Sequence, residues 1–289
     1  MDTAAITPRG GLRIVAFNVR PVAYAMTVAW AARHGHTIAL LVTTPGPPAR
    51  RSMQYHETIA AAPPEQEIVV TTRPKRLVPI ITAVAPDLIV CGSFPYRIPP
   101  EVVALPRLGA VNFHPAPLPR YRGPNPFRQI YDGAATLGAT LHRIAPEFDA
   151  GQVLARLSRP MPDDVTPETV WPVLSELFTA TFEQGLARAV AGEPGTPQDE
   201  REATYAGAYG EAECWLDWHA PRRLLQCRAT ALAMEGCAVK AIIAGQEYTV
   251  AGVTPLQGQE EAAAPGTVLD HDERGFTLRV GDGAILVAV

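Results

Sequence analysis

The chain has 289 residues, of which 47% are hydrophobic and 19% charged, and its formal net charge is −4. These values fit a globular protein with one large domain and one small domain. No apolar run approaches the roughly 18 residues of a membrane span, and residues 1–11 lack the apolar segment of a secretory signal. We therefore expect a soluble, cytoplasmic protein with no membrane partner.

The cysteines and the first turn exclude two kinds of site. The four cysteines show neither a CxxC pair nor the spacing of a zinc site, so reduced thiols and no metal centre are expected. The turn at residues 18–21 contains no glycine, so it lacks the Gly-rich cradle that binds a pyrophosphate. A nicotinamide or flavin dinucleotide cofactor is therefore not expected.

Buried strands and helices alternate through the first 190 residues. This alternation predicts an α/β fold with a Rossmann-like, mostly parallel sheet and helices on both faces. In the fourth of the predicted helices, Asn125 is expected to be the N-cap and Pro126 the first helical residue. The predicted strands are 12–18, 36–43, 67–71, 88–91, 108–113, 138–144 and 152–157, and the predicted helices are 22–33, 53–62, 75–85, a short one entered from a loop within 123–132, and 166–190.

The pattern changes in a stretch rich in Gly, Pro and acidic residues. We expect this stretch, 192–204, to be a linker between a domain at 1–191 and a domain at 205–289. The second domain combines one helix with short strands, which predicts a small, open, OB-like β-barrel. Its helix is expected at 221–234, and its strands at 237–244, 247–254, 266–270, 275–280 and 284–289.

The densest polar pattern follows the strand at 108–113. Three prolines occupy alternate positions directly after His114 and end the strand there. Side chains alternate along a strand, so Asn112 and His114 point to the same face. Open α/β sheets bind their ligands at the carboxyl ends of the strands, and this places both residues at a candidate site.

Two more polar residues come from the next supersecondary unit. Asp149 lies in the turn 145–151, and His142 lies in the preceding strand, on the same face as Thr140. His142 is a rival to His114, which we prefer because it lies at a strand end. Taken singly, each residue has an ordinary explanation as a turn cap, a hydrogen-bonded core histidine or an Asx turn.

The combined pattern is much more specific. The sequence N-x-H-P-x-x-L-P-R-Y-R-G from Asn112, followed by F-D-x-G from Phe148, resembles the core of formyltransferases that use 10-formyltetrahydrofolate. This family includes methionyl-tRNA formyltransferase and the sugar and natural-product N-formyltransferases. The resemblance implies that Asn112 and His114 stabilise an oxyanion and that Asp149 governs protonation. It leaves open whether His114 or Asp149 takes the proton of the amine.

The resemblance also implies a folate site. In the family, the loop that follows the fourth strand holds the pterin ring, largely through main-chain atoms with apolar walls. The corresponding loop is 92–99, and we assign Phe94, Tyr96 and Ile98 to its wall, with plain packing as the alternative. The other residues assigned to folate binding are Pro115, Ala145 and Glu147.

The resemblance does not decide the acceptor amine. Binding a methionyl-tRNA needs clustered Arg and Lys, yet six basic residues stand against eleven acidic residues from Tyr205 onward. Arg50 and Arg51 lie in a loop that is longer and more basic in methionyl-tRNA formyltransferases. We therefore prefer a small acceptor, either an amino sugar nucleotide or an amino-acid-derived metabolite, with methionyl-tRNA as the alternative.

The sequence gives less support to two further functions. A 10-formyltetrahydrofolate hydrolase shares the core but normally carries an N-terminal regulatory domain, for which the first eleven residues leave no room. A non-enzymatic RNA-binding protein fits the C-terminal barrel but gives no reason for Asn112, His114 and Asp149 at this spacing. Formyl transfer is therefore the preferred activity, and the sequence does not predict the oligomeric state.

Overall fold

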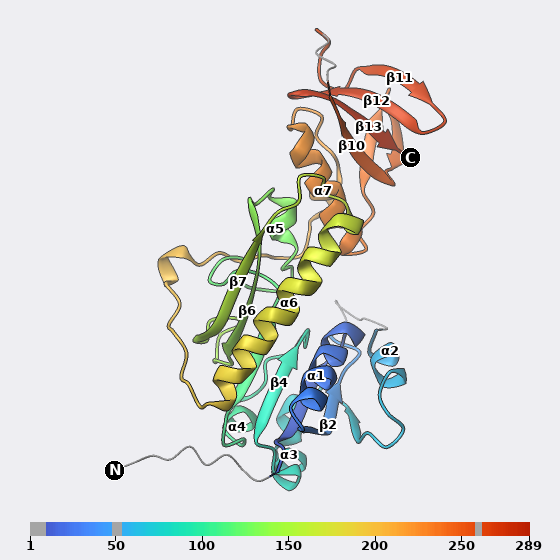
Figure 1. The fold of residues 1–289 in the computed structure, drawn as a ribbon. Helices are drawn as coiled ribbons and strands as arrows, with labels where there is room; N and C mark the ends of the chain where they lie inside the picture. Colours follow the sequence, from blue (N-terminus) through green and yellow to red (C-terminus); the bar gives the residue numbers. More distant parts are fainter. Residues whose placement is uncertain (1–9, 48–53, 258–261) are drawn as a thin grey trace. The chain divides into compact units, whose positions relative to one another are not determined.

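The computed structural model describes residues 10–47, 54–257 and 262–289. The chain forms two compact units, which are coloured along the sequence in Figure 1. The first unit draws on 1–123, 138–157 and 177–204, and the second on 124–137, 158–176 and 205–289. The domain boundaries at 191 and 205 stay a prediction.

A seven-stranded sheet forms the centre of the α/β fold in the described part of the chain. Its order is β3-β2-β1-β4-β5-β6-β7. The pairs between β3 and β5 are parallel, whereas β5 and β6 run antiparallel. The strands are β1 (Arg13–Asn18), β2 (Thr37–Thr43), β3 (Ile68–Val70), β4 (Leu88–Gly92), β5 (Ala110–His114), β6 (Thr136–Arg143) and β7 (Val153–Pro160).

Most helices follow the predicted periodicity, but the short helix α4 (Pro100–Val103) was not predicted. The helix predicted at 75–85 begins as a 3-10 turn, η2 (Pro74–Leu77), before α3 (Val78–Val84). Residue 53, where the second helix was predicted to begin, lies outside the described residues. The other helices up to residue 190 are α1 (Pro21–Arg33), α2 (Gln54–Ala60), α4 (Pro100–Val103), α5 (Arg128–Tyr131) and α6 (Pro167–Val190).

The predicted cap of the fourth helix is wrong. α5 has Phe127 as its N-cap, so Asn125 and Pro126 lie outside the helix. The side-chain amide of Asn125 donates to the carbonyl of Gly207 instead, at 3.2 Å. Because this contact is made far along the chain, the local capping pattern did not reveal it.

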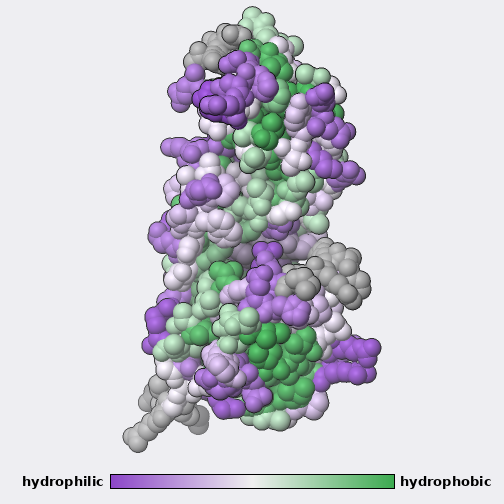
Figure 2. Space-filling view, turned by 90° about the vertical axis from the view of Figure 1, so that its right-hand side faces the viewer, coloured by the Kyte–Doolittle hydropathy of each residue, from purple (hydrophilic) through white to green (hydrophobic). Residues whose placement is uncertain are grey.

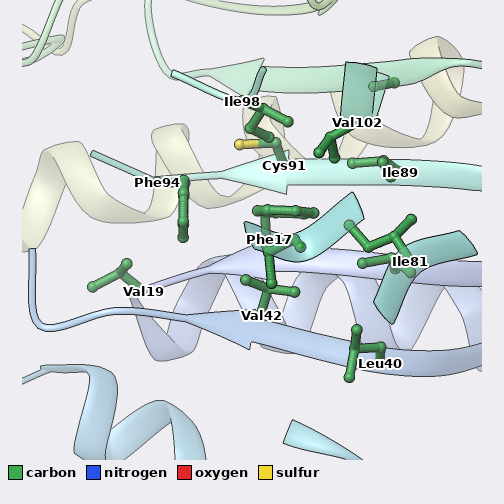
Figure 3. Packing of buried hydrophobic residues seen from close by; sticks show 13 residues of the cluster. Phe17, Val19, Leu40, Val42, Ile81, Ile89, Cys91, Phe94, Ile98 and Val102 are labelled. Carbon is green, nitrogen blue, oxygen red and sulfur yellow. The ribbon is translucent and has the colours of Figure 1, made fainter. Parts of the chain in front are cut away.

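A hydrophobic cluster holds one face of the sheet. Phe17 from β1, Val42 from β2 and Ile89 from β4 are fully buried and pack with Ile81 from α3. Figure 3 shows these side chains pointing toward one another. Burying each such side chain contributes about 1.5–3 kcal/mol to the stability of the fold. The strands that lead into the candidate site are therefore held in place by this core.

The other face of β5 packs against α6. The ring of Phe113 meets Phe178 and Phe182 edge-on, with centroids 5.2 and 5.8 Å apart. Gly185 of α6 lies so close to β6 that an added Cβ would come within 2.6 Å of the Cβ of Leu141. Because Phe113 faces α6, its neighbours Asn112 and His114 face the opposite side.

The C-terminal strands form two antiparallel sheets in the described residues. One has the order β10-β13-β12-β11 and the other is the hairpin β8-β9. The strand predicted at 247–254 is two strands, because the Val250 N–H donates to Val239 and the Ala251 N–H donates to Ala288. The elements are α7 (Arg222–Met234), β8 (Lys240–Ile243), β9 (Gln246–Thr249), β10 (Gly252–Leu256), β11 (Val268–Asp272), β12 (Gly275–Val280) and β13 (Gly283–Ala288).

The predicted fold class is confirmed: a mostly parallel sheet covered by helices is followed by a small domain of antiparallel strands. None of the described helices is long and apolar enough to cross a membrane.

Figure 2 shows one face of the surface, where hydrophilic and hydrophobic residues are mixed, with an apolar area in the lower part. Exposed large apolar side chains include Val22, Val70 and Ile80, and isolated ones are ordinary on protein surfaces.

Candidate active site

The antiparallel pairing of β5 and β6 brings four polar side chains to one face. Asn112 lies opposite His142, and His114 lies opposite Thr140. Directly opposed residues on neighbouring strands project to the same side of a sheet. The two histidines that the sequence presented as rivals therefore belong to the same cluster.

Asp149 completes the cluster from the turn after β6. Its carboxylate accepts a hydrogen bond from the backbone N–H of Gly123 at 2.8 Å and another from Nδ2 of Asn112 at 3.2 Å. It also lies 3.6 Å from Nδ1 of His114 and 3.5 Å from Nε2 of His142. Asn112, His114 and Asp149, predicted as a set, are thus brought together, although their catalytic roles stay a prediction.

Backbone carbonyls fix the orientation of both histidines. Nε2 of His114 donates to the carbonyl of Tyr121 at 2.7 Å, and Nδ1 of His142 donates to the carbonyl of Arg143 at 2.8 Å. A carbonyl only accepts, so the other ring nitrogen is the acceptor in each neutral imidazole. The neutral His114 therefore turns its Nδ1 lone pair toward Asp149.

The side-chain amide of Asn112 uses both of its hydrogens inside the cluster. Nδ2 lies 3.1 Å from Nε2 of His142 and 3.2 Å from Oδ1 of Asp149. An amide nitrogen only donates, so Nε2 of His142 and Oδ1 of Asp149 are the acceptors of these two bonds. His142 and Asp149 together set the direction in which this amide points.

Burial and charge set the protonation states. Burial alone would raise the pKa of Asp149, but His114, His142 and the Gly123 amide outweigh it and hold that pKa well below its usual range. Burial lowers the pKa of His114, and the nearby charge of Asp149 only partly opposes this. The site at neutral pH is therefore a carboxylate beside a neutral imidazole.

The Cys91 thiol, which the charge of Asp149 reaches, is held in its protonated form. Cys91 in β4 is buried, and burial, together with the negative charge of Asp149, raises the pKa of its thiol to about 12. A thiolate is the reactive form of cysteine. Within the described ranges, moreover, no group of three His, Cys, Asp or Glu side chains is arranged to hold a metal ion.

The residues assigned to the folate wall lie in different environments. Phe94 and Ile98 are buried in the core cluster of Figure 3, where Phe94 meets Phe17 edge-on at 5.1 Å. Packing alone accounts for these two side chains, and their contact with folate stays a prediction. Of the other assigned residues, Tyr96, Pro115 and Ala145 are half-buried and Glu147 is exposed.

Sequence reasoning missed two contributors to the cluster. His142 was set aside because it lies in mid-strand, and the missing signal was the antiparallel direction of β6. Gln198, in the segment predicted as a linker, donates to the carbonyls of Asp149 and Gly151 at 2.8 Å. No local pattern reveals a contact across 49 residues of chain.

Two stretches of the chain match models of known families. Residues 13–178 match the family described as formyl transferase, and residues 210–289 match the formyl transferase C-terminal domain. The chain belongs to the formyl transferase family. It is 31% identical over 282 residues to the methionyl-tRNA formyltransferase of Thiobacillus denitrificans, covering 96% of this chain and 90% of that protein. The methionyl-tRNA formyltransferase of Enterococcus faecalis is 26% identical, with 87% and 82% covered.

Solved structures share the fold of this formyl transferase. WlaRD, a sugar 3N-formyltransferase, superimposes with a TM-score of 0.68 at 13% identity, covering 97% of this chain and 98% of that chain. HypX from Aquifex aeolicus superimposes with a TM-score of 0.65 at 20% identity. That match covers 96% of this chain, which spans 44% of the HypX chain. The family resemblance drawn from the sequence is confirmed.

Proposed function

We propose that this formyl transferase moves the formyl group of 10-formyltetrahydrofolate to the primary amine of a small acceptor. The observation that carries the proposal is the cluster of Asn112, His114 and Asp149 at the end of β5. The donor is supported by two structural neighbours: HypX was crystallised with tetrahydrofolic acid and WlaRD with 5-N-formyl-THF. 10-Formyltetrahydrofolate is consumed in this reaction as a substrate.

The proposed chemistry begins with attack of the amine on the formyl carbon. Negative charge then develops on the formyl oxygen, and the attacking nitrogen must lose a proton. In our assignment an N–H of Asn112 donates to that oxygen. Because both hydrogens of this amide are already donated, Asn112 gives up its bond to Asp149 or to His142 as the charge develops.

In our proposal, Nδ1 of His114 accepts the proton that the attacking amine loses. This nitrogen carries the lone pair of the neutral ring, because Nε2–H is bound to the carbonyl of Tyr121. The Asp149 carboxylate, 3.6 Å away, stabilises the imidazolium that forms. The imidazolium then returns the proton to the donor nitrogen as the bond between that nitrogen and the formyl carbon breaks, so charge and protons balance.

The folate contacts in the proposal remain those assigned from the sequence. The buried side chains of Phe94 and Ile98 anchor the loop 92–99 in the core, which supports a rigid ligand-binding loop. Tyr96 packs partly buried against the same cluster. The remaining contacts would be made by Pro115, Ala145 and Glu147, which are at least partly accessible.

The charge of the C-terminal region favours a small acceptor. With six basic and eleven acidic residues from Tyr205 onward, this region is net negative and would repel a phosphate backbone. The preceding residues, with 19 basic and 18 acidic side chains, do not compensate. Arg50 and Arg51 lie outside the described residues.

Methionyl-tRNA is the second candidate acceptor. The identity of 31% over nearly the full length of a methionyl-tRNA formyltransferase favours it, as does the match of the C-terminal domain. An acceptor panel decides between the candidates: formyl release from 10-formyltetrahydrofolate is measured with methionyl-tRNA, amino sugar nucleotides and amino acids. Activity with methionyl-tRNA alone would overturn the preference for a small amine.

The catalytic assignment predicts large effects of two substitutions. Asn112→Ala removes a donor to the oxyanion, and His114→Ala removes the proton carrier. Loss of one oxyanion donor typically costs on the order of 100- to 1,000-fold in kcat, and loss of a general acid–base group on the order of 100- to 10,000-fold. Each variant should lose turnover on its respective scale while remaining folded by circular dichroism. A folded variant with near wild-type turnover in the folate-coupled assay would refute the assignment.

A further inference from the structure

Asp149 is held in a backbone conformation that is uncommon outside glycine, although Asp adopts it more readily than most residues. Its φ is +56°, in the left-handed region. Both hydrogens of the Gln198 side-chain amide bind the carbonyls of this turn, one at Asp149 and one at Gly151, each at 2.8 Å. Such conformations persist where surrounding contacts over-determine them. Gln198 supplies two of those contacts.

The direction of the Gln198 amide is itself fixed. Its Oε1 accepts from the guanidinium of Arg122, at 3.2 Å from Nε and 2.8 Å from Nη2. The amide therefore has its oxygen toward Arg122 and its nitrogen toward the two carbonyls. The residue after Arg122 is Gly123, whose N–H binds the Asp149 carboxylate at 2.8 Å. Asp149 is thus held at both its main chain and its side chain.

Thr204, from the same segment of chain as Gln198, supports the main chain that contacts His114. Oγ1 of Thr204 accepts from the N–H of Tyr121 at 2.9 Å, and the backbone of Thr204 bonds to Arg122 and Pro119. Tyr121 also has a left-handed φ of +60°, and its carbonyl accepts from Nε2 of His114 at 2.7 Å. Thr204 therefore supports the carbonyl that orients the imidazole.

We propose that Gln198 and Thr204 are positioning residues for formyl transfer: Gln198 holds Asp149, and Thr204 holds the carbonyl that orients His114. The proposal rests on the proposed function, because it assigns these residues a role in that reaction. Gln198 and Thr204 then contribute to the active site, whereas Asp199, between them, binds Arg201 instead. All of these contacts lie within the first compact unit.

A positioning role and a purely structural role make different predictions. Asp149 raises the pKa of the His114 imidazole, against the larger lowering by burial. The other titratable groups near this pair are His142 on β6 and Cys91 on β4. If Gln198 holds Asp149 in place, its loss weakens the contact between carboxylate and imidazole and lowers the pKa of His114. Loss of a merely structural residue would lower the stability of the protein and leave the pKa of His114 unchanged.

The first test compares Gln198→Ala and Gln198→Glu with the wild type. The Glu variant still accepts from Arg122 but cannot donate to the two carbonyls. Displacing a catalytic group by about 1 Å costs on the order of 100-fold, so both variants should lose kcat on that scale with the KM for 10-formyltetrahydrofolate nearly unchanged. The acid limb of the rate profile should move to lower pH. A folded Gln198→Glu variant with wild-type kcat and an unmoved profile would overturn the proposal.

The matched control is Asp199→Asn, in the neighbouring position. The side chain of Asp199 contacts only Arg201 among the interactions of the described residues, so this variant should keep the wild-type rate and pH profile. Thr204→Ser keeps the hydroxyl that binds Tyr121 and should retain activity, whereas Thr204→Val should not. Equal activity of the Ser and Val variants would remove Thr204 from the proposal.

An NMR titration separates this inference from the proposed function. The imidazole resonances of His114 are followed against pH in the wild type and in Gln198→Ala, with His114→Asn used for assignment. A lower pKa in Gln198→Ala supports the positioning role even if no tested amine is formylated, a result that would count against the proposed function alone. An unchanged pKa, with formyl transfer intact in the wild type, would count against the positioning role alone.

Discussion

His114 links the chemistry of the site to the stability of the fold. The folded protein holds this imidazole neutral, because burial lowers its pKa below the ordinary value of 6.5. Unfolding returns the ring to water, where it binds a proton more readily. The unfolded state thus takes up more protons as the pH falls through 6.5, and the folded state loses stability there.

This linkage predicts an acid-sensitive free energy of unfolding. Between pH 6.5 and the lower pKa of the folded state, one such group contributes a slope of up to about 1.4 kcal/mol per pH unit. Urea denaturation of the wild type and of His114→Asn at pH 7 and pH 5 measures it. The variant should lose less stability on acidification, and equal losses would show that His114 is not held neutral.

The residues of the site were only partly predictable from the sequence. The alternation of side chains placed Asn112 and His114 on one face, and the F-D-x-G pattern added Asp149. His142 was underrated, since its partnership with Asn112 depends on β6 running antiparallel to β5. Gln198 was missed because a contact between a loop and a segment 49 residues away leaves no periodic signal.

Among the elements, α6 shows how closely helix and sheet approach behind the site. Gly185 leaves no room for a side chain, since an added Cβ would lie 2.5 Å from Cδ2 of Leu141 and 2.6 Å from its Cβ. Leu141 is fully buried in β6, one residue before His142. The contact therefore sets the distance between α6 and a strand that carries a site residue.

Gly185→Ala should destabilise the protein by about 1–3 kcal/mol, the usual cost of overpacking a core. The gain in helix propensity, roughly 1 kcal/mol, opposes this only in part. Gln184→Ala, at an exposed neighbouring position, is the control and should lie within about 0.5 kcal/mol of the wild type. Chemical denaturation compares the three proteins, and a Gly185→Ala variant as stable as the control would contradict the tight packing.

Element boundaries were predictable where hydrophobic periodicity is strong and less so where distant contacts decide. α6 and β12 lie within one residue of the predicted spans. The strand predicted at 247–254 divides because the chain changes from one sheet to another after Val250, a choice made by partners far along the sequence. Asn125 likewise binds Gly207 in place of capping a helix.

At the scale of the whole molecule, the family matches favour methionyl-tRNA as the acceptor, whereas the charge distribution favours a small amine. The two family matches cover residues 13–178 and 210–289, as expected of a relative of methionyl-tRNA formyltransferases. The region from Tyr205 onward is nonetheless net negative. Homology constrains the fold and the reacting groups most strongly, whereas long-range charge bears directly on whether a polyanion is bound.

The two candidate acceptors differ in how strongly their binding should depend on salt concentration. A protein that contacts 6–10 phosphates loses roughly 1,000- to 100,000-fold in affinity between 50 and 200 mM salt, because binding releases counterions. A small amine acceptor with at most two phosphates should lose no more than about tenfold over the same range. We expect the weaker dependence for the acceptor that the panel identifies, measured as its Kd by calorimetry at four salt concentrations. A steep loss with methionyl-tRNA as the only productive acceptor would instead mean that local basic surface overrides the net negative charge of the C-terminal region.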